Sequence, residues 1–426
     1  MLHCLAHNLI VGLGCAATIA AAAPVLPCGL DQLALRKDSN SDSDKLQISS
    51  RSSSPLDPYP DKPRVVFRED GTFKITVFSD LHYGENPWDA WGPQQDVNST
   101  ILMNIVLTDE KPDYVVLNGD QITGENTFRE NSTTLIDEIV APLNHFKIPF
   151  SSTQGNHDNE PNITHLEEIR REQLVAPLSY TRTVPPGIGG EDGPGTYWVP
   201  VSAILFQATR IDINSFVQTF SRNLIDQSPA LVLWFFDSRG GFTTGSNSTP
   251  VPDWVDSSVA GWIQQEVAYM NAGWGPADVV GRGNLAFVHI PPHAIQALQP
   301  DLNSTQDPGL NADVLGSGST QATTDASNDG KDQPFWDALS EYVLNLHAVI
   351  SGHDHGNEWC KREPTKNVIF CFDKHSGYGG YSSAGWGHGV RNIVFSSPKV
   401  SDAPVTWIRM EDGETHARIT LNAGYM

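Results

Sequence analysis

The stretch Phe73-Lys-Ile-Thr-Val-Phe-Ser-Asp80-Leu-His82 decides the fold of this chain. Residues 73–79 are mostly apolar or β-branched, which predicts a short buried strand. An aspartate and a histidine follow directly at the carboxyl end of that strand. Carboxylate oxygen and imidazole nitrogen are donors that divalent Zn, Mn and Fe accept. The stretch therefore predicts a strand that delivers metal ligands to the edge of a sheet.

The same arrangement recurs after four further strand candidates. Taken singly, such motifs are more often turns, helix caps or hydrogen-bonded surface histidines. Five of them in one chain, each at a strand end, favour a shared metal site. The four further motifs are Asn118-Gly-Asp120, Gly155-Asn156-His157-Asp158, His289-Ile-Pro and Gly352-His353-Asp354-His355.

Strand and helix candidates alternate along the chain, which predicts an α/β fold with a mostly parallel sheet and helices on its faces. Ligands of such sheets bind outside the carboxyl ends of the strands. The expected strands are 73–79, 114–118, 150–153, 231–236, 285–289 and 348–351, and the expected helices are 97–110, 133–145, 164–174, 257–270 and 335–346.

In this order the five motifs resemble the signature of the calcineurin-like metallophosphoesterases: Asp-x-His, Gly-Asp, Gly-Asn-His-Asp/Glu, a single His, and Gly-His-x-His. The chain looks closest to the fungal and plant branch related to purple acid phosphatases, because of Phe-Val-His289-Ile-Pro and the block Gly352-His-Asp-His-Gly-Asn-Glu-Trp-Cys360. The resemblance covers roughly residues 64–397. It implies a two-metal hydrolase on a four-layer α/β/β/α metallophosphoesterase sandwich.

The resemblance also implies a ligand set. The chain departs from the purple enzymes at two places, because Thr123 stands where they have a tyrosine ligand and His82 stands where they have glycine. Without a phenolate, a colourless pair of divalent ions (Mn, Zn or Fe) is expected, and the motifs do not select among them. Carried over by motif, Asp80, His82 and His355 would hold one metal, Asn156, His289 and His353 the other, and Asp120 would bridge them.

The residues next to Asn156 are the candidates for proton transfer. Two bound cations can activate a water and stabilise the charge of an in-line displacement at phosphorus, so no protein nucleophile is needed. We expect His157 to protonate the leaving group or to bind the phosphoryl group in the transition state, and Asp158 to orient its imidazole. The alternative for His157 is an additional ligand or a structural hydrogen bond.

A Gly-rich stretch from Lys374 to Arg391 carries aromatic and cationic residues. It fits one wall of a substrate pocket, and it fits equally well a long glycine-rich loop in which Arg391 forms an ordinary ion pair.

Composition narrows the class of substrate. The 426 residues include 27 basic and 50 acidic side chains, which gives a net charge of −23 and a sequence pI of about 4.8. Such a surface repels nucleic acids. A small phosphorylated substrate is therefore favoured, whereas the oligomeric state is not set by the sequence.

The first 63 residues differ in composition from the rest. Residues 9–23 are apolar, Ala-rich and too short to span a bilayer, so residues 1–23 are expected to be a signal peptide, the alternative being a buried Ala-rich helix. Residues 24–63 are rich in Ser and Pro and are interpreted as a disordered linker or propeptide, which leaves residues 64–426 for the enzyme domain. A secreted protein with no membrane segment after processing is expected.

Cysteines and glycosylation sequons agree with secretion. Cys360 and Cys371 flank a segment as if across a hairpin and are expected to pair, which leaves Cys28 unassigned. N-glycosylation is possible at five sequons outside the cytosol. These sequons begin at Asn98, Asn131, Asn162, Asn247 and Asn303.

The favoured function is that of a secreted phosphatase, acting on phosphate monoesters through a hydroxide that bridges two metals. A phosphodiesterase with the same metal site is the runner-up, and a secreted glycoprotein that keeps the fold without catalysis is the third possibility. Every inferred ligand position holds a competent donor, which favours the two enzymes.

Overall fold

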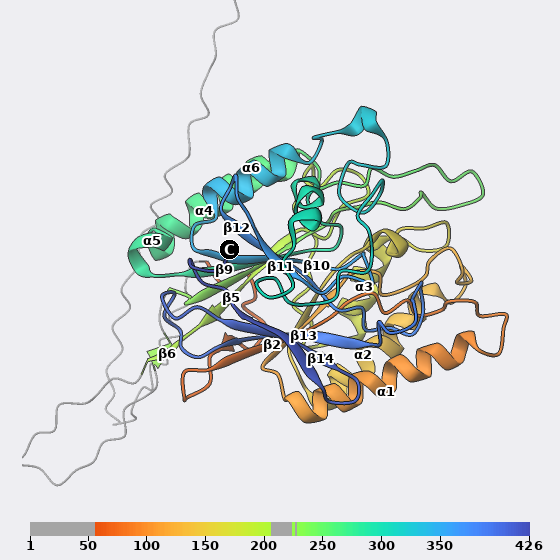
Figure 1. The fold of residues 1–426 in the computed structure, drawn as a ribbon, viewed down its shortest axis with the longest axis horizontal. Helices are drawn as coiled ribbons and strands as arrows, with labels where there is room; N and C mark the ends of the chain where they lie inside the picture. The colour runs from red at the N-terminus through yellow and green to blue at the C-terminus, as the bar shows by residue number, and fades with distance from the viewer. Residues whose placement is uncertain (1–55, 206–223, 226–227) are drawn as a thin grey trace, which may run out of the picture. The chain divides into compact units, whose positions relative to one another are not determined.

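The computed structural model describes residues 56–205, 224–225 and 228–426, so the expected signal peptide and most of the linker lie outside the described residues. Two sheets stack face to face, and helices cover their outer faces (Figure 1). Among the described residues, no helix has the length and the apolar character needed to cross a membrane.

The first sheet has seven strands and is parallel at its centre. Strands β8, β9, β10 and β12 run parallel, while β5 and β11 pair antiparallel with β8 and β12. In spatial order the strands are β1 (Val65–Val66), β5 (Tyr197–Ser202), β8 (Leu231–Phe236), β9 (Gly283–Val288), β10 (Leu346–Ser351), β12 (Val368–Phe372) and β11 (Cys360–Glu363).

The second sheet has six strands and is parallel on one side only. Strands β2, β3 and β4 run parallel, whereas β13, β14 and β15 are antiparallel to their neighbours. The order is β15 (Thr415–Thr420), β14 (Val405–Met410), β13 (Gly389–Phe395), β2 (Phe73–Phe78), β3 (Tyr114–Asn118) and β4 (Phe150–Thr153), and a separate pair joins β6 (Ile204–Leu205) to β7 (Leu224–Ile225).

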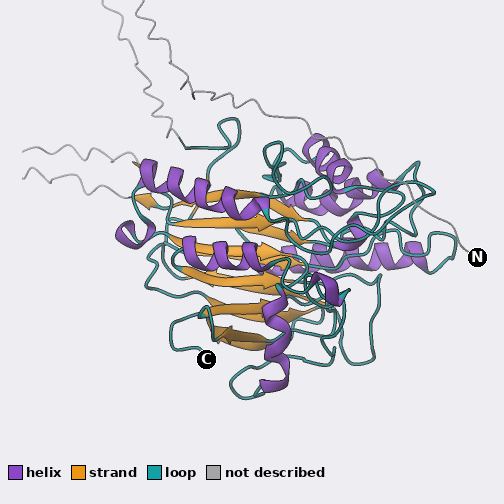
Figure 2. Ribbon diagram, turned by 90° about the horizontal axis from the view of Figure 1, so that it is seen from above, coloured by secondary structure: helices purple, strands orange, loops and turns teal. Residues whose placement is uncertain are grey.

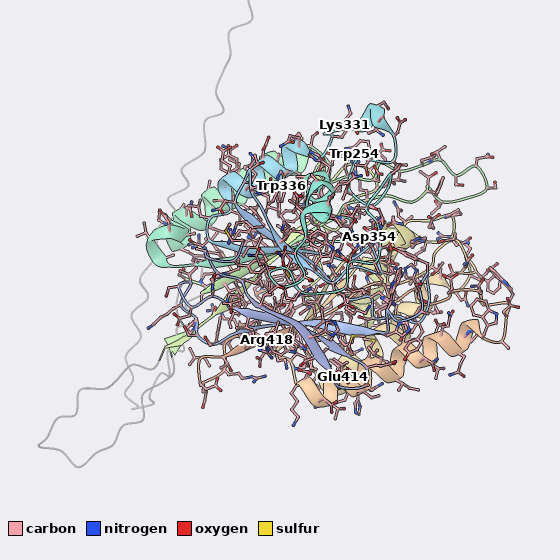
Figure 3. All side chains as sticks on the ribbon, viewed as in Figure 1. Trp254, Lys331, Trp336, Asp354, Glu414 and Arg418 are labelled. Carbon is pink, nitrogen blue, oxygen red and sulfur yellow. A yellow bond between two sulfur atoms is a disulfide. The ribbon has the colours of Figure 1, made fainter. Side chains whose placement is uncertain are left out.

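Alternation along the strands builds the layers, because successive side chains of a strand point to opposite faces. In β8, Leu233 and Phe235 lie in the core between the sheets. Trp234 and Phe236 face outward into a core that contains Trp262 of α4 (Ser258–Trp274) and Trp336 of α6 (Gln333–Tyr342), the latter labelled in Figure 3.

The second sheet follows the same rule. In β3, Val116 lies between the sheets, while Leu117 packs outward with Leu102 of α1 (Gly92–Glu110) and Ile139 of α2 (Leu135–Phe146). The remaining α-helices are α3 (His165–Val175) and α5 (Ala277–Val280). Figure 2 shows the helices stacked against the strands. The α/β/β/α sandwich is therefore confirmed, with two mixed sheets in place of one mostly parallel sheet.

Several boundaries expected from the sequence are wrong. The helix expected to begin at residue 97 begins at Gly92, and the one expected to end at residue 270 ends at Trp274. Residues 56–63 belong to the fold, because Tyr59 is buried in the core between the sheets and its hydroxyl donates to the carbonyl oxygen of Tyr180 at 2.7 Å. The helix expected to end at residue 346 ends at Tyr342, because Leu346 already begins β10.

Candidate metal centre

The candidate ligands come from both sheets and meet at the carboxyl ends of their parallel strands. Asp80, Asp120 and Asn156 follow β2, β3 and β4 of the second sheet. From the first sheet, His289 follows β9, and β10 leads into the loop that carries His353 and His355, on either side of the Asp354 labelled in Figure 3.

The backbone turns sharply where these side chains leave their strands. Asp80, His82, Asp120 and His353 have φ angles of 54°, 50°, 47° and 79°. Residues other than glycine rarely adopt this left-handed conformation, which costs about 1–3 kcal/mol each. Such strain persists where the surrounding structure over-determines it, and here it falls on four residues of the expected ligand set.

The side chains form two groups, each with ligand atoms within 4.8 Å of one another: Asp80, His82 and His355, and Asp120, His289 and His353. Asp120 lies beside both groups. Its Oδ2 is 3.0 Å from His289 Nε2 and 3.7 Å from His82 Nε2. The structure thus brings together six residues of the expected ligand set, with Asp120 in one group and beside the other. The seventh, Asn156, directly follows Gly155, which packs against Asp120 and His289.

Three of the histidines have one ring nitrogen fixed by a backbone carbonyl. His289 Nδ1 and His353 Nε2 donate to the carbonyl oxygens of Asn118 and Gly318, both at 2.8 Å, and His355 Nδ1 donates to that of Tyr381 at 2.5 Å. A carbonyl can only accept, so the outer nitrogen carries a proton, and in the neutral form of each ring the inner nitrogen offers its lone pair to a metal.

His82 is oriented by a short chain of side chains. Thr123 Oγ1 donates to Glu85 Oε2 at 2.7 Å and therefore accepts from His82 Nδ1 at 3.0 Å. Thr123, which stands where the purple enzymes have a tyrosine ligand, thus orients His82, which stands where they have glycine. Neither Glu85 nor this contact was expected from the motifs.

The donor atoms fit a pair of divalent metal ions. His82 Nε2, His353 Nδ1 and Asn156 Oδ1 are buried and have no hydrogen-bond partner among the described residues. A buried polar atom without a partner is costly, and a cation would satisfy it. Burial lowers the pKa of His82 to about 3 and that of His353 to about 4, which keeps both rings in the neutral form that ligates metals.

His157 lies beside this centre. Its amide donates to Asp120 Oδ1 at 2.8 Å, its ring lies 5.0 Å from that of His82, and its Nδ1 lies 2.8 Å from Glu125 Oε1. Glu125 was not expected from the sequence, because no motif spacing marks it.

Asp158 does not orient His157, and that expectation is wrong. The carboxylate of Asp158 accepts backbone amide hydrogens from Gln121, Ile122 and Gly155 at 2.8, 2.9 and 2.8 Å. It fastens the loop after β3 to the loop after β4. Asp158 thus supports the backbone of Asp120 and Asn156 and has no oxygen directed at the imidazole.

The Gly-rich stretch after Lys374 is divided between two roles. The ring of Tyr381 stacks on that of His355 with centroids 4.1 Å apart, so this loop supports the metal centre. Arg391 is fully buried, and its guanidinium donates to the carbonyl oxygens of Phe372 and Glu358 at 2.9 and 2.6 Å. Arg391 is therefore a structural residue of β13.

The fold is an α/β/β/α sandwich, and groups of histidine and carboxylate side chains meet where its strands end. This combination defines a class of metal-dependent hydrolases. The calcineurin-like phosphoesterase family model matches residues 73–357. This chain belongs to that family, and the match includes all the candidate ligands.

Two relatives show how broad the similarity is. The chain is 25% identical over 382 residues to "Probable inactive purple acid phosphatase 29" of Arabidopsis thaliana, covering 84% of this chain and 87% of the relative. It is 29% identical over 323 residues to "Phosphatase DCR2" of Saccharomyces cerevisiae, covering 72% of this chain and 48% of the relative. A crystal structure of a dimetal phosphatase from Danio rerio is similar at 12% identity, with a TM-score of 0.47, covering 83% of this chain and all of that one.

Proposed function

We propose that this protein hydrolyses small phosphate monoesters with two divalent metal ions. The observation that supports the proposal is the complete donor set, in which each of four histidines has one ring nitrogen held by the protein and the other left for a metal. One relative is named inactive, but that name does not settle whether this chain is active. In this chain, every candidate ligand position holds a residue that can bind a metal.

The side chains around the centre have distinct tasks. When bound, two divalent cations would activate a water and stabilise charge on the phosphoryl oxygens. Asp120 belongs to one ligand group and lies beside the other, and its carboxylate would supply the negative charge that the two cations share. The backbone amide of His157 donates to Asp120 Oδ1, and the imidazole of His157 is the group that we propose donates a proton to the leaving oxygen.

The decisive experiment combines metal analysis with two chromogenic substrates. Protein purified without chelator is analysed for Mn, Zn and Fe and assayed with p-nitrophenyl phosphate and with bis(p-nitrophenyl) phosphate. We expect two metals per chain, faster hydrolysis of the monoester, and loss of activity on chelation that added metal restores. Faster hydrolysis of the diester would identify a phosphodiesterase, and two bound metals with neither activity would contradict the proposal.

We also propose secretion and N-glycosylation. A disulfide joins Cys360 and Cys371, as expected from their spacing, and disulfides persist in oxidising compartments. Among the sequons, Asn131, Asn247 and Asn303 are exposed and accessible to glycosylation. Amino-terminal sequencing of protein from the medium of expressing cells is expected to start after residue 23, and glycosidase treatment is expected to lower its mass.

A further inference from the structure

A second cluster of ionisable side chains lies next to the candidate metal centre. It consists of Glu125, His157 and Glu160, whose potential ligand atoms lie within 4.8 Å of one another. Glu125 belongs to the loop after β3, and the other two belong to the segment after β4. The amide of Gly124 donates to the carbonyl oxygen of His157 at 2.9 Å, so the two segments are joined at the point where Glu125 meets the imidazole.

An imidazole that transfers a proton to substrate needs one nitrogen free and the ring held in one orientation. Glu125 Oε1 lies 2.8 Å from His157 Nδ1, which leaves Nε2 as the nitrogen available to a reacting group. The backbone of His157 is held by its amide contact with Asp120 Oδ1. The ring itself has its nearest carboxylate contact with Glu125.

The other nearby carboxylates make no ion pair with the His157 ring among the described residues. Asp158 accepts three backbone amide hydrogens, and Asp120 belongs to one ligand group and lies beside the other. Glu160 is 6% exposed and belongs to the same cluster, but the carboxylate that forms an ion pair with the His157 ring is that of Glu125, at 2.8 Å. Glu125 is therefore the carboxylate in position to orient the ring without being part of the metal centre.

We propose that Glu125 is a positioning residue, which holds His157 by its Nδ1 so that Nε2 is presented to the leaving group of the substrate. This inference rests on the proposed function and adds a residue that the family motifs do not contain. An orienting carboxylate fixes both the tautomer and the direction of a histidine, and its loss commonly costs about 10- to 100-fold in activity.

The contact can be removed without threatening the fold. The Glu125 side chain is 36% exposed, and an ion pair that reaches solvent contributes little to stability. Glu125→Gln keeps the shape of the side chain and removes its charge. Glu130→Gln is the matched control, because Glu130 is an exposed glutamate of the same loop that makes no ion pair among the described residues.

The test is a double-mutant cycle on an alkyl phosphate with Glu125→Gln, His157→Ala and both together. We expect Glu125→Gln to lower kcat by about 10- to 100-fold with two metals retained, and to have no further effect in the His157→Ala background. Glu125→Asp should recover part of the rate, and Glu130→Gln should behave as wild type. Losses that multiply in the double variant would show that Glu125 acts independently of His157 and would overturn the proposal.

A second readout does not depend on turnover. In ¹⁵N-labelled protein, the ring signals of His157 are assigned among the 14 histidines by their absence in His157→Ala. Glu125→Gln should shift the Nδ1 signal of His157, whereas Glu130→Gln should not. An unchanged Nδ1 signal would overturn the positioning role. A third metal ion that is bound by the wild type and lost in Glu125→Gln would overturn it as well. A shifted signal in a protein without hydrolytic activity would support the contact and contradict the proposed function alone.

Discussion

Asp120 is the residue on which the two ligand groups converge. Its Oδ2 lies near His289 and His82, its Oδ1 accepts the amide hydrogen of His157, and its own φ of 47° is left-handed. One carboxylate thus sets the spacing between residues that come from three strands. A change at this position is expected to affect both metals together.

We predict that Asp120→Asn loses most of the bound metal and most of the activity in parallel. The amide keeps the size of the side chain but removes the negative charge that two cations would share. Elemental analysis and turnover of p-nitrophenyl phosphate measure the two losses, and Asp89→Asn, at an exposed position, is the control. A variant with two metals and near-native turnover would show that the bridging assignment is wrong.

His157 leads to a prediction about the leaving group. If its imidazole donates a proton, His157→Ala should keep two metals and lose about 10²- to 10⁴-fold in rate on alkyl phosphates. The loss should be smaller for p-nitrophenyl phosphate, because p-nitrophenolate needs little protonation. Equal losses on both substrates would indicate transition-state binding, and loss of metal would make His157 a ligand. Single-turnover rates keep slow product release from masking the difference.

The ligand residues could be predicted from the sequence, whereas the residues that orient them could not. Each ligand directly follows a buried strand or lies within a short motif, so local pattern locates it. Thr123, Glu85 and Glu125 act through loops whose course depends on packing with other loops. Asp158 misled the prediction for the same reason, since its neighbour in sequence is not its neighbour in space.

Among the elements, strands buried on both faces were predicted best. The bounds of β3 and β8 agree with the expected ranges because their apolar runs are nearly continuous, and those of β4 agree although only Phe150 of its four residues is apolar. No strand was predicted after Ser351, although the structure has β13 there. This strand contains the polar residues Arg391 and Asn392, which are fully buried. Polar residues inside a strand interrupt the apolar pattern, and only the tertiary contacts of Arg391 reveal why they are there.

The hairpin of β11 and β12 leads to a stability prediction. Cys360 and Cys371 are directly opposite each other, both are fully buried, and their disulfide closes a segment with a sequence separation of 11. Replacing both by alanine should lower the free energy of unfolding by about 3 kcal/mol, because the unfolded chain regains the freedom of the open loop. Urea denaturation measures the change. An unaltered midpoint and slope would show that the disulfide contributes nothing to stability.

Asp96, in the second turn of α1, leads to a prediction about pH. Asp96 accepts the amide hydrogen of Gly84 at 3.1 Å, and burial raises the pKa of its carboxyl to about 7. In the unfolded chain this carboxyl ionises near pH 4, so the folded state holds an extra proton between about pH 4 and 7. Stability from this group is therefore present in acid and is lost as the pH rises through 7.

Asp96→Asn should remove that dependence. Relative to the variant, the wild type should lose on the order of 1 kcal/mol of unfolding free energy between pH 5 and pH 8, a figure reduced for the partial exposure of the group. Urea unfolding at both pH values gives the difference, and Asp89→Asn should follow the wild type. A difference that does not change with pH would show that Asp96 is ionised throughout.

At the scale of the whole molecule, the metal centre joins the two sheets. Asp80, Asp120 and Asn156 extend from one sheet, and His289 and His353 extend from the other. The alternation of strands and helices alone predicted a single mostly parallel sheet, and only the resemblance implied two. Hydrophobic pattern reports whether a strand is buried, but it does not report which sheet a buried strand joins.

This arrangement predicts that metal stabilises the sandwich as a whole. Without cations, the centre has left-handed residues and buried donor atoms that lack partners among the described residues. The sheets are joined at this end by side-chain packing and by a few hydrogen bonds, such as those from His289 Nδ1 to the carbonyl oxygen of Asn118 and from Asn118 Nδ2 to Asp373 Oδ2. Because the ligands converge only in the folded state, metal binding should raise the free energy of unfolding, by about 2.7 kcal/mol at a free concentration one hundred times Kd. Thermal unfolding of the chelated protein should therefore show a Tm that rises with added metal, and Asp120→Asn should respond much less. Hydrogen exchange should slow on metal binding at the carboxyl ends of β2, β3, β9 and β10, in both sheets together. If protection increased in one sheet only, or if Tm were unchanged with two metals bound, the centre would not be joining the two sheets.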